Sequence, residues 1–218
     1  MIKAVIFDLD GVLIDSMEQH CKTELQPLHE MGVPATMEEL HEFIGVPAGD
    51  FFKAMLKKYG KKGDPEKLLE RKYALMEFGA EKIPAFPGAI ELVESLKSSG
   101  FLIAVGSSSR TFFVEKALAA IGLKEKIPVI ASSSEVKQGK PAPDIFLLAA
   151  KKLSLEPKEC VVIEDAIQGV NAAKAAGMKC IAVTNSFPAE KLKAAGAELV
   201  VKSLKQLSPK IIMGLGER

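Results

Sequence analysis

The chain has 218 residues, of which 48% are hydrophobic and 26% charged, and its 29 basic and 28 acidic residues give a net charge of +1. This composition is typical of a soluble globular protein with one large domain or two small ones. The balanced charge excludes a global field that would attract nucleic acid or an anionic membrane, so any affinity for an anion must be local.

Other features of the composition narrow the class of protein further. The apolar run before Asp8 is too short for a signal peptide and no later run reaches membrane-spanning length, so we expect a cytoplasmic protein. The cysteines, Cys21, Cys160 and Cys180, form no CxxC or Cys/His cluster, which argues against a zinc site or a disulfide framework. With no Trp and two Tyr, stacking on nucleic-acid bases is disfavoured, and no protein partner can be inferred.

Short apolar runs and helical patterns alternate along most of the chain. The apolar runs are Ala4 to Phe7, Phe101 to Val105, Val161 to Ile163, and Cys180 to Val183. They do not alternate with polar residues, so both faces of each predicted strand are buried, as in a parallel sheet. Helical spacing lies between them, from Ala89 to Leu96 and from about Ala166 to Ala176, before Gly177. The pattern predicts a doubly wound, Rossmann-like α/β domain.

One segment interrupts this alternation. From Ser16 to about Glu81 we find no convincing strand, only helical stretches separated by Gly- and Pro-containing breaks. We predict an inserted all-helical cap domain, residues 16–82, within a catalytic core formed by residues 1–15 and 83–218. Because the insert follows the first strand and its turn, we expect it to form a lid over the strand ends.

Polar residues follow the first predicted strand, where parallel α/β sheets bind ligands. The segment reads Asp8-Leu9-Asp10-Gly11. Its two-residue spacing can send both carboxylates to one side, and Gly11 permits close backbone approach to an anion. Taken alone, the same residues also fit a helix cap, a turn or a calcium loop.

The second predicted strand ends in Gly106-Ser107-Ser108-Ser109-Arg110, before a helical stretch. Hydroxyl and backbone N–H groups at a helix N-terminus make an anion site, although one serine capping the helix fits equally well.

Two later segments supply a cation and a further pair of acids. Lys140 stands between Gly139 and Pro141, so it is either an ordinary solvent-facing lysine or a cation with a defined position. Glu164-Asp165 follows the third predicted strand. Asp165 fits an N-cap or, together with Asp8 and Asp10, an oxygen ligand of Mg²⁺.

The order of these segments resembles the haloacid dehalogenase-like superfamily. The matching residues are Asp8 to Val12 (DLDGV), Ser107, Lys140 and Glu164-Asp165. The resemblance covers nearly the whole chain, and the helical insert looks like the first-type cap of the family. The branch of β-phosphoglucomutases and small sugar-phosphate phosphatases is the most similar, through DLDGVLIDS, GKPAPDIF and EDAIQGV.

The resemblance implies a Mg²⁺-dependent transfer of phosphoryl groups from a small phosphorylated metabolite. Asp8 would form an aspartyl phosphate, Asp10 would act as general acid and base, and Lys140 would neutralise charge. The implied metal ligands are Asp8, the Asp10 main-chain carbonyl, Asp165, and Glu164 either directly or through water. The implied phosphate-binding groups are Ser107 and the backbone N–H groups of Leu9, Asp10, Gly11 and Ser108.

The acceptor of the phosphoryl group decides between a phosphatase and a mutase. His20 and Ser109 match residues of β-phosphoglucomutases, and Arg110 adds a cation beside Ser109. The family's cap arginine is missing, however, from Gly45-Val46-Pro47-Ala48-Gly49. Without it a second phosphate loses a bidentate partner, so we predict a phosphatase. A mutase, a phosphoglycolate phosphatase and a catalytically silent regulatory binder stay open. Asp10 argues against a dehalogenase, because that branch lacks the second acid.

Overall fold

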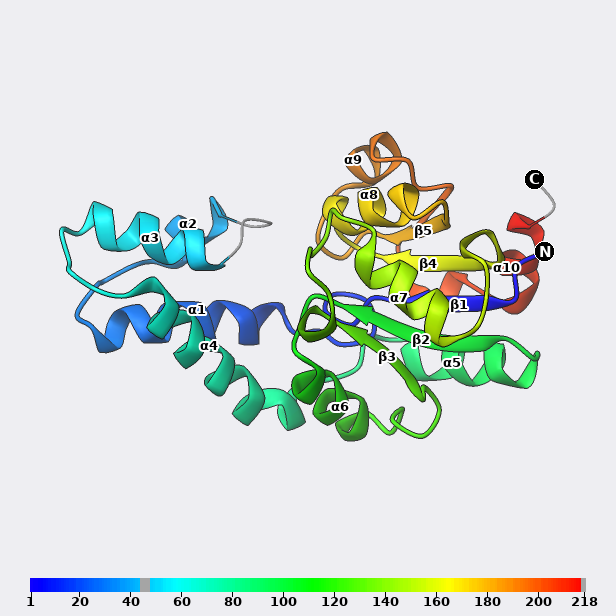
Figure 1. Ribbon diagram of the computed structural model, residues 1–218, viewed down its shortest axis with the longest axis horizontal. Helices are drawn as coiled ribbons and strands as arrows, with labels where there is room; N and C mark the ends of the chain where they lie inside the picture. Colours follow the sequence, from blue (N-terminus) through cyan, green and yellow to red (C-terminus); the bar gives the residue numbers. More distant parts are fainter. Residues whose placement is uncertain (44–47, 217–218) are drawn as a thin grey trace. The chain divides into compact units, whose positions relative to one another are not determined.

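The computed structural model describes residues 1–43 and 48–216 (Figure 1). The chain forms two compact units. The first consists of Met1–Asp15 and Ile83–Arg218, and the second of Ser16–Lys82.

The first unit is built on a six-stranded sheet with the order β3-β2-β1-β4-β5-β6. Its strands are β1 (Ala4–Phe7), β2 (Leu102–Ser107), β3 (Val129–Ser132), β4 (Cys160–Glu164), β5 (Lys179–Val183) and β6 (Leu199–Val201). All neighbouring strands pair in parallel, and β1 lies between β2 and β4. The predicted parallel sheet is therefore confirmed.

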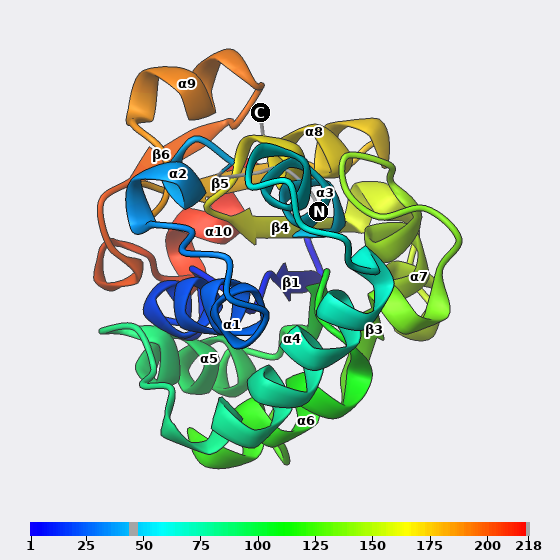
Figure 2. The same cartoon turned by 90° about the vertical axis from the view of Figure 1, so that its left-hand side faces the viewer.

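Helices cover both faces of this sheet. They are α5 (Ala89–Ser98), α6 (Thr111–Ala120), α7 (Asp144–Lys152), α8 (Ile167–Ala175), α9 (Ala189–Ala194) and α10 (Pro209–Leu215). Figure 2 shows α7 and α8 on one side of the sheet and α5 and α6 on the other, and in Figure 1 α7 lies in front of the strands. Ala4 and Ile6 of β1 pack with Phe146 of α7 and Val170 of α8 in one core cluster. This arrangement confirms the doubly wound α/β class.

The inner strands match the apolar runs because their side chains are buried on both faces. Every residue of β1 and of β4 is buried. The structure adds β3 and β6, which the apolar runs do not predict. Both are edge strands of four and three residues, and each begins with two half-buried residues, so their apolar signal is weaker.

The described residues of the second unit, 16–43 and 48–82, form helices joined by turns and loops, with no strand among them. Its helices are α1 (Met17–Glu30), α2 (Met37–His41), α3 (Ala48–Lys58) and α4 (Pro65–Gly79). Leu28, Phe51 and Phe52 are fully or almost fully buried at the centre of its core. The helical insert of the fold class is thus observed. Residues 44–47 lie outside the described residues, and they include Gly45 to Pro47 of the stretch from which the family's cap arginine is missing. Ala48, the next residue of that stretch, begins α3.

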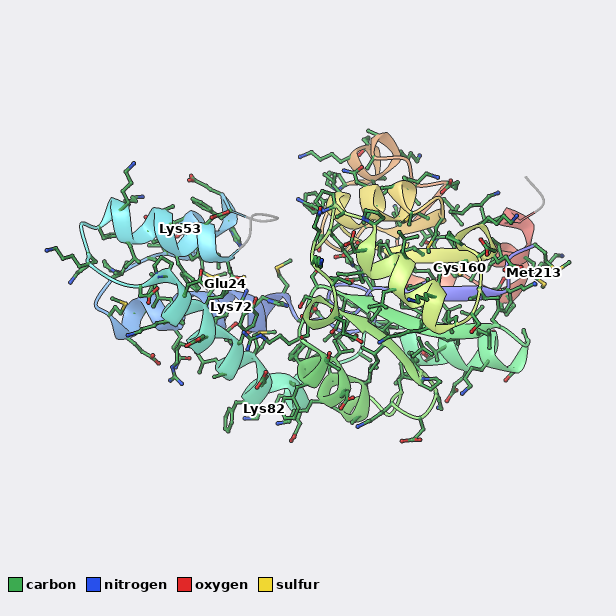
Figure 3. All side chains as sticks on the ribbon, viewed as in Figure 1. Glu24, Lys53, Lys72, Lys82, Cys160 and Met213 are labelled. Carbon is green, nitrogen blue, oxygen red and sulfur yellow. The ribbon has the colours of Figure 1, made fainter. Side chains whose placement is uncertain are left out.

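A nearly buried ion pair joins two helices of this unit. Lys72 of α4 donates to Glu24 of α1 at 2.5 Å, and the two side chains are 9% and 17% exposed (Figure 3). Lys53 of α3 is an exposed lysine that pairs with Asp50 one turn earlier. Among the described residues, no helix has both the length and the apolar character that crossing a bilayer requires.

Candidate active site

The carboxyl ends of β1 and β4 lie side by side at the centre of the sheet. Phe7 pairs with Ile163, and the Asp8 N–H donates to the Ile163 carbonyl at 2.9 Å. Asp8 therefore follows β1 at the level where Glu164 ends β4. The side chains of both acids are almost completely buried.

Lys140 lies between these two carboxylates. Its Nζ donates to Asp8 Oδ1 at 2.6 Å and to Glu164 Oε1 at 2.7 Å, and its side chain is 7% exposed. The same ammonium stands 4.7 Å from the centre of the Phe146 ring. A Cβ on Gly106 would lie 2.9 Å from that ring, so the glycine provides space for it. Lys140 is therefore a fixed, buried cation and not a solvent-facing lysine.

Glu164 connects the lysine to the backbone of the next loop. Its Oε2 accepts from the N–H groups of Asp165 and Ala166, each at 2.7 Å. Helix α8 passes so close that a Cβ on Gly169 would lie 1.7 Å from Glu164 Oε1. Glu164 is thus held at both carboxylate oxygens.

Gly11 lets the first turn approach Asp165. Its φ of +82° favours glycine, and a Cβ there would lie 2.0 Å from Asp165 Oδ2. The Gly11 N–H already donates to the Ile14 carbonyl at 2.9 Å. Gly11 therefore contributes its conformation, and its predicted role as an N–H donor to phosphate stays a prediction. Leu9, before it, has a fully buried side chain.

The serine segment lies on the other side of β1. Ser107 ends β2, is fully buried, and accepts a hydrogen bond from the Ser109 N–H at 3.0 Å. Ser109 Oγ donates to Asp10 Oδ2 at 2.8 Å, while Ser108 and Arg110 are exposed. The N-cap of α6 is Arg110, without a side-chain cap, so the alternative in which a serine caps this helix is wrong.

Asp165 is not a helix cap either. The N-cap of α8 is Ala166, and it makes no side-chain cap. Asp165 Oδ2 instead accepts a hydrogen bond from Ser186 Oγ. Asn185 donates to the Gly11 carbonyl at 2.7 Å. Neither residue is predicted from the sequence, although both come shortly after the run Cys180 to Val183 and so lie at the same edge of the sheet.

Three buried acids at this edge could hold a metal ion. Asp8, Glu164 and Asp165 each offer a carboxylate oxygen, and these oxygens lie within 4.8 Å of one another. Burial, opposed by Lys140, raises the pKa of Asp8 to about 7. Burial and then Glu164 and Asp8 raise the pKa of Asp165 well above its usual range.

The charges of these groups also support a metal ion at this site. Burial lowers the pKa of Lys140, but the Asp8 and Glu164 carboxylates outweigh it and raise the pKa above its usual range, so the lysine stays charged. One cation cannot balance three ionised acids. An oxygen-lined site with excess negative charge fits Mg²⁺, a hard divalent cation.

The raised pKa of Asp8 makes the stability of the metal-free protein depend on pH. Between the usual value of 3.8 and about 7, the folded protein binds more protons at Asp8 than the unfolded chain does. Its stability therefore falls as pH rises through this window. We expect the melting temperature in EDTA to fall from pH 4 to 7 relative to that of Asp8→Asn. Parallel curves for the two proteins would contradict the assignment.

His20, the remaining predicted site residue, lies on α1 in the second unit. It is half-buried, and its N–H donates to the Ser16 carbonyl at 2.9 Å. Its predicted contact with substrate remains a prediction. In the first unit, the structure brings together Asp8, Lys140, Glu164 and Asp165, and it joins Asp10 to Ser109.

Comparison with known proteins agrees with this geometry. A model of the family described as haloacid dehalogenase-like hydrolase matches residues 5–183. Hexitol phosphatase B of Escherichia coli (strain K12) is 31% identical, and the match covers 98% of this chain and 97% of that protein. Protein SUPPRESSOR OF QUENCHING 1, chloroplastic, of Arabidopsis thaliana is 39% identical over 95% of this chain, but the match spans only 20% of its length.

A solved structure shows the same likeness in three dimensions. The β-phosphoglucomutase (pgmB) of Clostridium difficile has a TM-score of 0.84 and 30% sequence identity, covering 100% of this chain and 98% of that one. The match of the family model over most of the sequence and the near full-length match to a phosphatase lead to one conclusion. The chain belongs to the haloacid dehalogenase-like hydrolase family.

Proposed function

We propose that this protein is a Mg²⁺-dependent phosphatase that hydrolyses small phosphomonoesters through an aspartyl phosphate on Asp8. The observation that carries the proposal is the buried contact of Asp8 with Lys140, beside the acids Glu164 and Asp165. A nucleophilic carboxylate, a fixed cation and oxygen ligands for a metal lie together at one edge of the sheet.

Electrostatics explains why the cation and the acids belong together. A phosphomonoester dianion repels the Asp8 carboxylate, so positive charge must offset this repulsion before attack. The Lys140 ammonium, 2.6 Å from Asp8, supplies part of it. Mg²⁺ would supply the remainder beside the phosphoryl oxygens, held by Asp8, the Asp10 carbonyl, Asp165, and Glu164 either directly or through water.

The reaction then has two steps at phosphorus. An Asp8 oxygen attacks, the bond from phosphorus to the leaving oxygen breaks, and Asp10 protonates that oxygen. In the second step Asp10 takes a proton from water, which attacks the aspartyl phosphate and releases inorganic phosphate and Asp8. Ser107 and the N–H groups of Leu9, Asp10 and Ser108 would hold the phosphoryl oxygens.

The contact between Ser109 and Asp10 orients the acid–base residue. A hydroxyl that donates to Asp10 Oδ2 at 2.8 Å fixes one carboxylate oxygen. We assign the two proton transfers, to the leaving group and from water, to this carboxyl group. This assigns Ser109 a role that does not require a second phosphate on the substrate.

The names of the relatives support one class of substrate. The near full-length similarity to a hexitol phosphatase supports a sugar or polyol phosphate. The similarity to a β-phosphoglucomutase supports phosphomutase activity as a second candidate. A screen of phosphomonoesters tests both, with β-glucose 1-phosphate offered alone and together with glucose 1,6-bisphosphate. Phosphate release identifies a phosphatase, and glucose 6-phosphate formation without net phosphate release identifies a mutase.

Removal of the metal should abolish turnover. In excess EDTA we expect hydrolysis of p-nitrophenyl phosphate to fall by at least about 100-fold. Without the metal, Lys140 alone would offset the repulsion between the substrate dianion and the Asp8 carboxylate. Addition of Mg²⁺ beyond the chelator should restore the rate. Activity that survives chelation would remove the metal from the proposal.

A further inference from the structure

The loop that follows β5 bonds to both segments that carry the acids. Asn185 Nδ2 donates to the carbonyl of Gly11, in the turn after β1, at 2.7 Å. Ser186 Oγ donates to Oδ2 of Asp165, in the loop after β4. Two neighbouring residues thus connect three strand ends.

Both ends of this loop are held by backbone hydrogen bonds or by secondary structure. Strand β5 pairs with β4 up to Ala182, which lies opposite Glu164. The Thr184 N–H then donates to the Val201 carbonyl of β6 at 3.0 Å, and Pro188 is the N-cap of α9. Asn185 and Ser186 therefore start from a defined position at the end of the sheet.

Asp165 is confined on two sides by these contacts. Gly11 lies against its carboxylate, with space for a hydrogen but none for a Cβ. Ser186 occupies Oδ2 on the same carboxylate. Rotation of the Asp165 side chain would break the serine hydrogen bond, and displacement of Gly11 would break the asparagine hydrogen bond. The orientation of the carboxylate is therefore determined by groups that carry no charge.

From these contacts we propose that Ser186 and Asn185 are positioning residues for the metal ion, and that they fix Asp165 so that Oδ1 binds it. The inference rests on the proposed Mg²⁺ site and adds two residues to it. Ser186 acts on the ligand directly, whereas Asn185 acts through the Gly11 turn that supports the ligand.

The expected size of the effect follows from the roles of groups that bond to metal ligands. Loss of such a partner typically lowers metal affinity or activity by about 10- to 100-fold, because the ligand then samples orientations that do not bind. Ser186 should lie within this range. Asn185 should have a smaller effect, since the positive φ of Gly11 already restricts the turn.

Calorimetric titration with Mg²⁺ tests the inference without any substrate. Relative to wild type, Ser186→Ala should raise the Kd for Mg²⁺ by about 10-fold or more, and Asn185→Ala by about threefold. Ser186→Thr keeps the hydroxyl and should stay within about twofold. Ser99→Ala is the matched control, because it removes an exposed serine hydroxyl that bonds only within the end of α5.

A kinetic measurement separates positioning from general damage to the fold. The Mg²⁺ concentration for half-maximal phosphatase activity should rise in Ser186→Ala, while kcat at saturating Mg²⁺ stays within about threefold. A loss of kcat with unchanged Mg²⁺ affinity would overturn the inference.

Mg²⁺ binding by the wild type and by Ser186→Ala shows whether the inference fails or the proposed metal site fails. If the wild type binds Mg²⁺ and Ser186→Ala binds it equally well, the inference fails and the proposed function stands. If the wild type binds no Mg²⁺, the proposed metal site itself fails. Should Ser186→Ala not fold, Asn185→Ala decides, since Asn185 is exposed and its removal leaves no buried gap.

Discussion

Replacing Asp8 by Asn is expected to lower phosphate release by about 10,000-fold or more, because the amide cannot form the aspartyl phosphate. The protein should remain folded. Asn has nearly the same shape as Asp, and Lys140 keeps its contact with Glu164 at 2.7 Å. The rate with p-nitrophenyl phosphate at saturating Mg²⁺ and the far-ultraviolet circular dichroism spectrum measure the two effects.

Asp50→Asn is the matched control for this experiment. It removes one carboxylate from an exposed position on α3, where Asp50 pairs with the exposed Lys53. Its rate should equal that of the wild type. Rapid acid quenching should also trap a phosphoryl group on the peptide that contains Asp8 in the wild type and in Asp50→Asn, but not in Asp8→Asn. An Asp8→Asn enzyme with wild-type activity would exclude the covalent route.

Lys140→Met should have the second largest effect, and it should appear in both activity and stability. Activity should fall by about 1,000-fold, because Asp8 loses the neighbouring cation that would offset its repulsion of the substrate dianion. In EDTA at pH 8 the metal-free protein should lose about 3 kcal/mol of stability, since Asp8 and Glu164 are left buried without a positive partner. Urea unfolding and steady-state kinetics measure these losses.

The reason for the loss of stability can be tested in the same variant. At pH 5 Asp8 can bind a proton, so the deficit relative to wild type should shrink. Mg²⁺ should also restore part of the stability at pH 8. Lys53→Met is the matched control, because an exposed lysine paired with an exposed acid contributes about 0.5 kcal/mol or less. Equal stability of Lys140→Met and wild type in EDTA would contradict the assigned ion pair.

The sequence predicts the inner part of the sheet well and its edges poorly. Strands β1, β2, β4 and β5 stand between neighbours and carry continuous apolar runs. The edge strands β3 and β6 each have one neighbour within the sheet, and each starts with half-buried residues. A short, partly exposed strand has no pattern that separates it from a loop, so it becomes visible only in three dimensions.

The candidate site likewise has residues that the sequence predicts and residues that it does not. Asp8, Lys140 and Asp165 are predictable because charged residues directly after apolar runs of a parallel sheet must gather at one edge. Asn185 and Ser186 occupy a comparable position but resemble an ordinary turn, since Asn and Ser are common there. Only the observed hydrogen bonds to Gly11 and Asp165 distinguish them.

The sequence around a single residue also does not decide whether that residue caps a helix or belongs to the candidate site. Ser107 and Asp165 both precede helices, where either residue type is a good N-cap. The structure excludes a side-chain cap at each helix start. The difference arises because each side chain has a partner elsewhere, the Ser109 N–H for Ser107 and the Ser186 hydroxyl for Asp165.

The close packing of backbone against the acids limits which substitutions the site can accept. Gly11 and Gly169 carry no reactive group, yet a single methyl at either position would overlap the carboxylate of Asp165 or of Glu164. A substitution at either glycine would therefore displace an acid without changing any of the charged residues. In a relative that keeps Asp8, Glu164 and Asp165 but has lost one of these glycines, we expect a distorted centre and weakened activity.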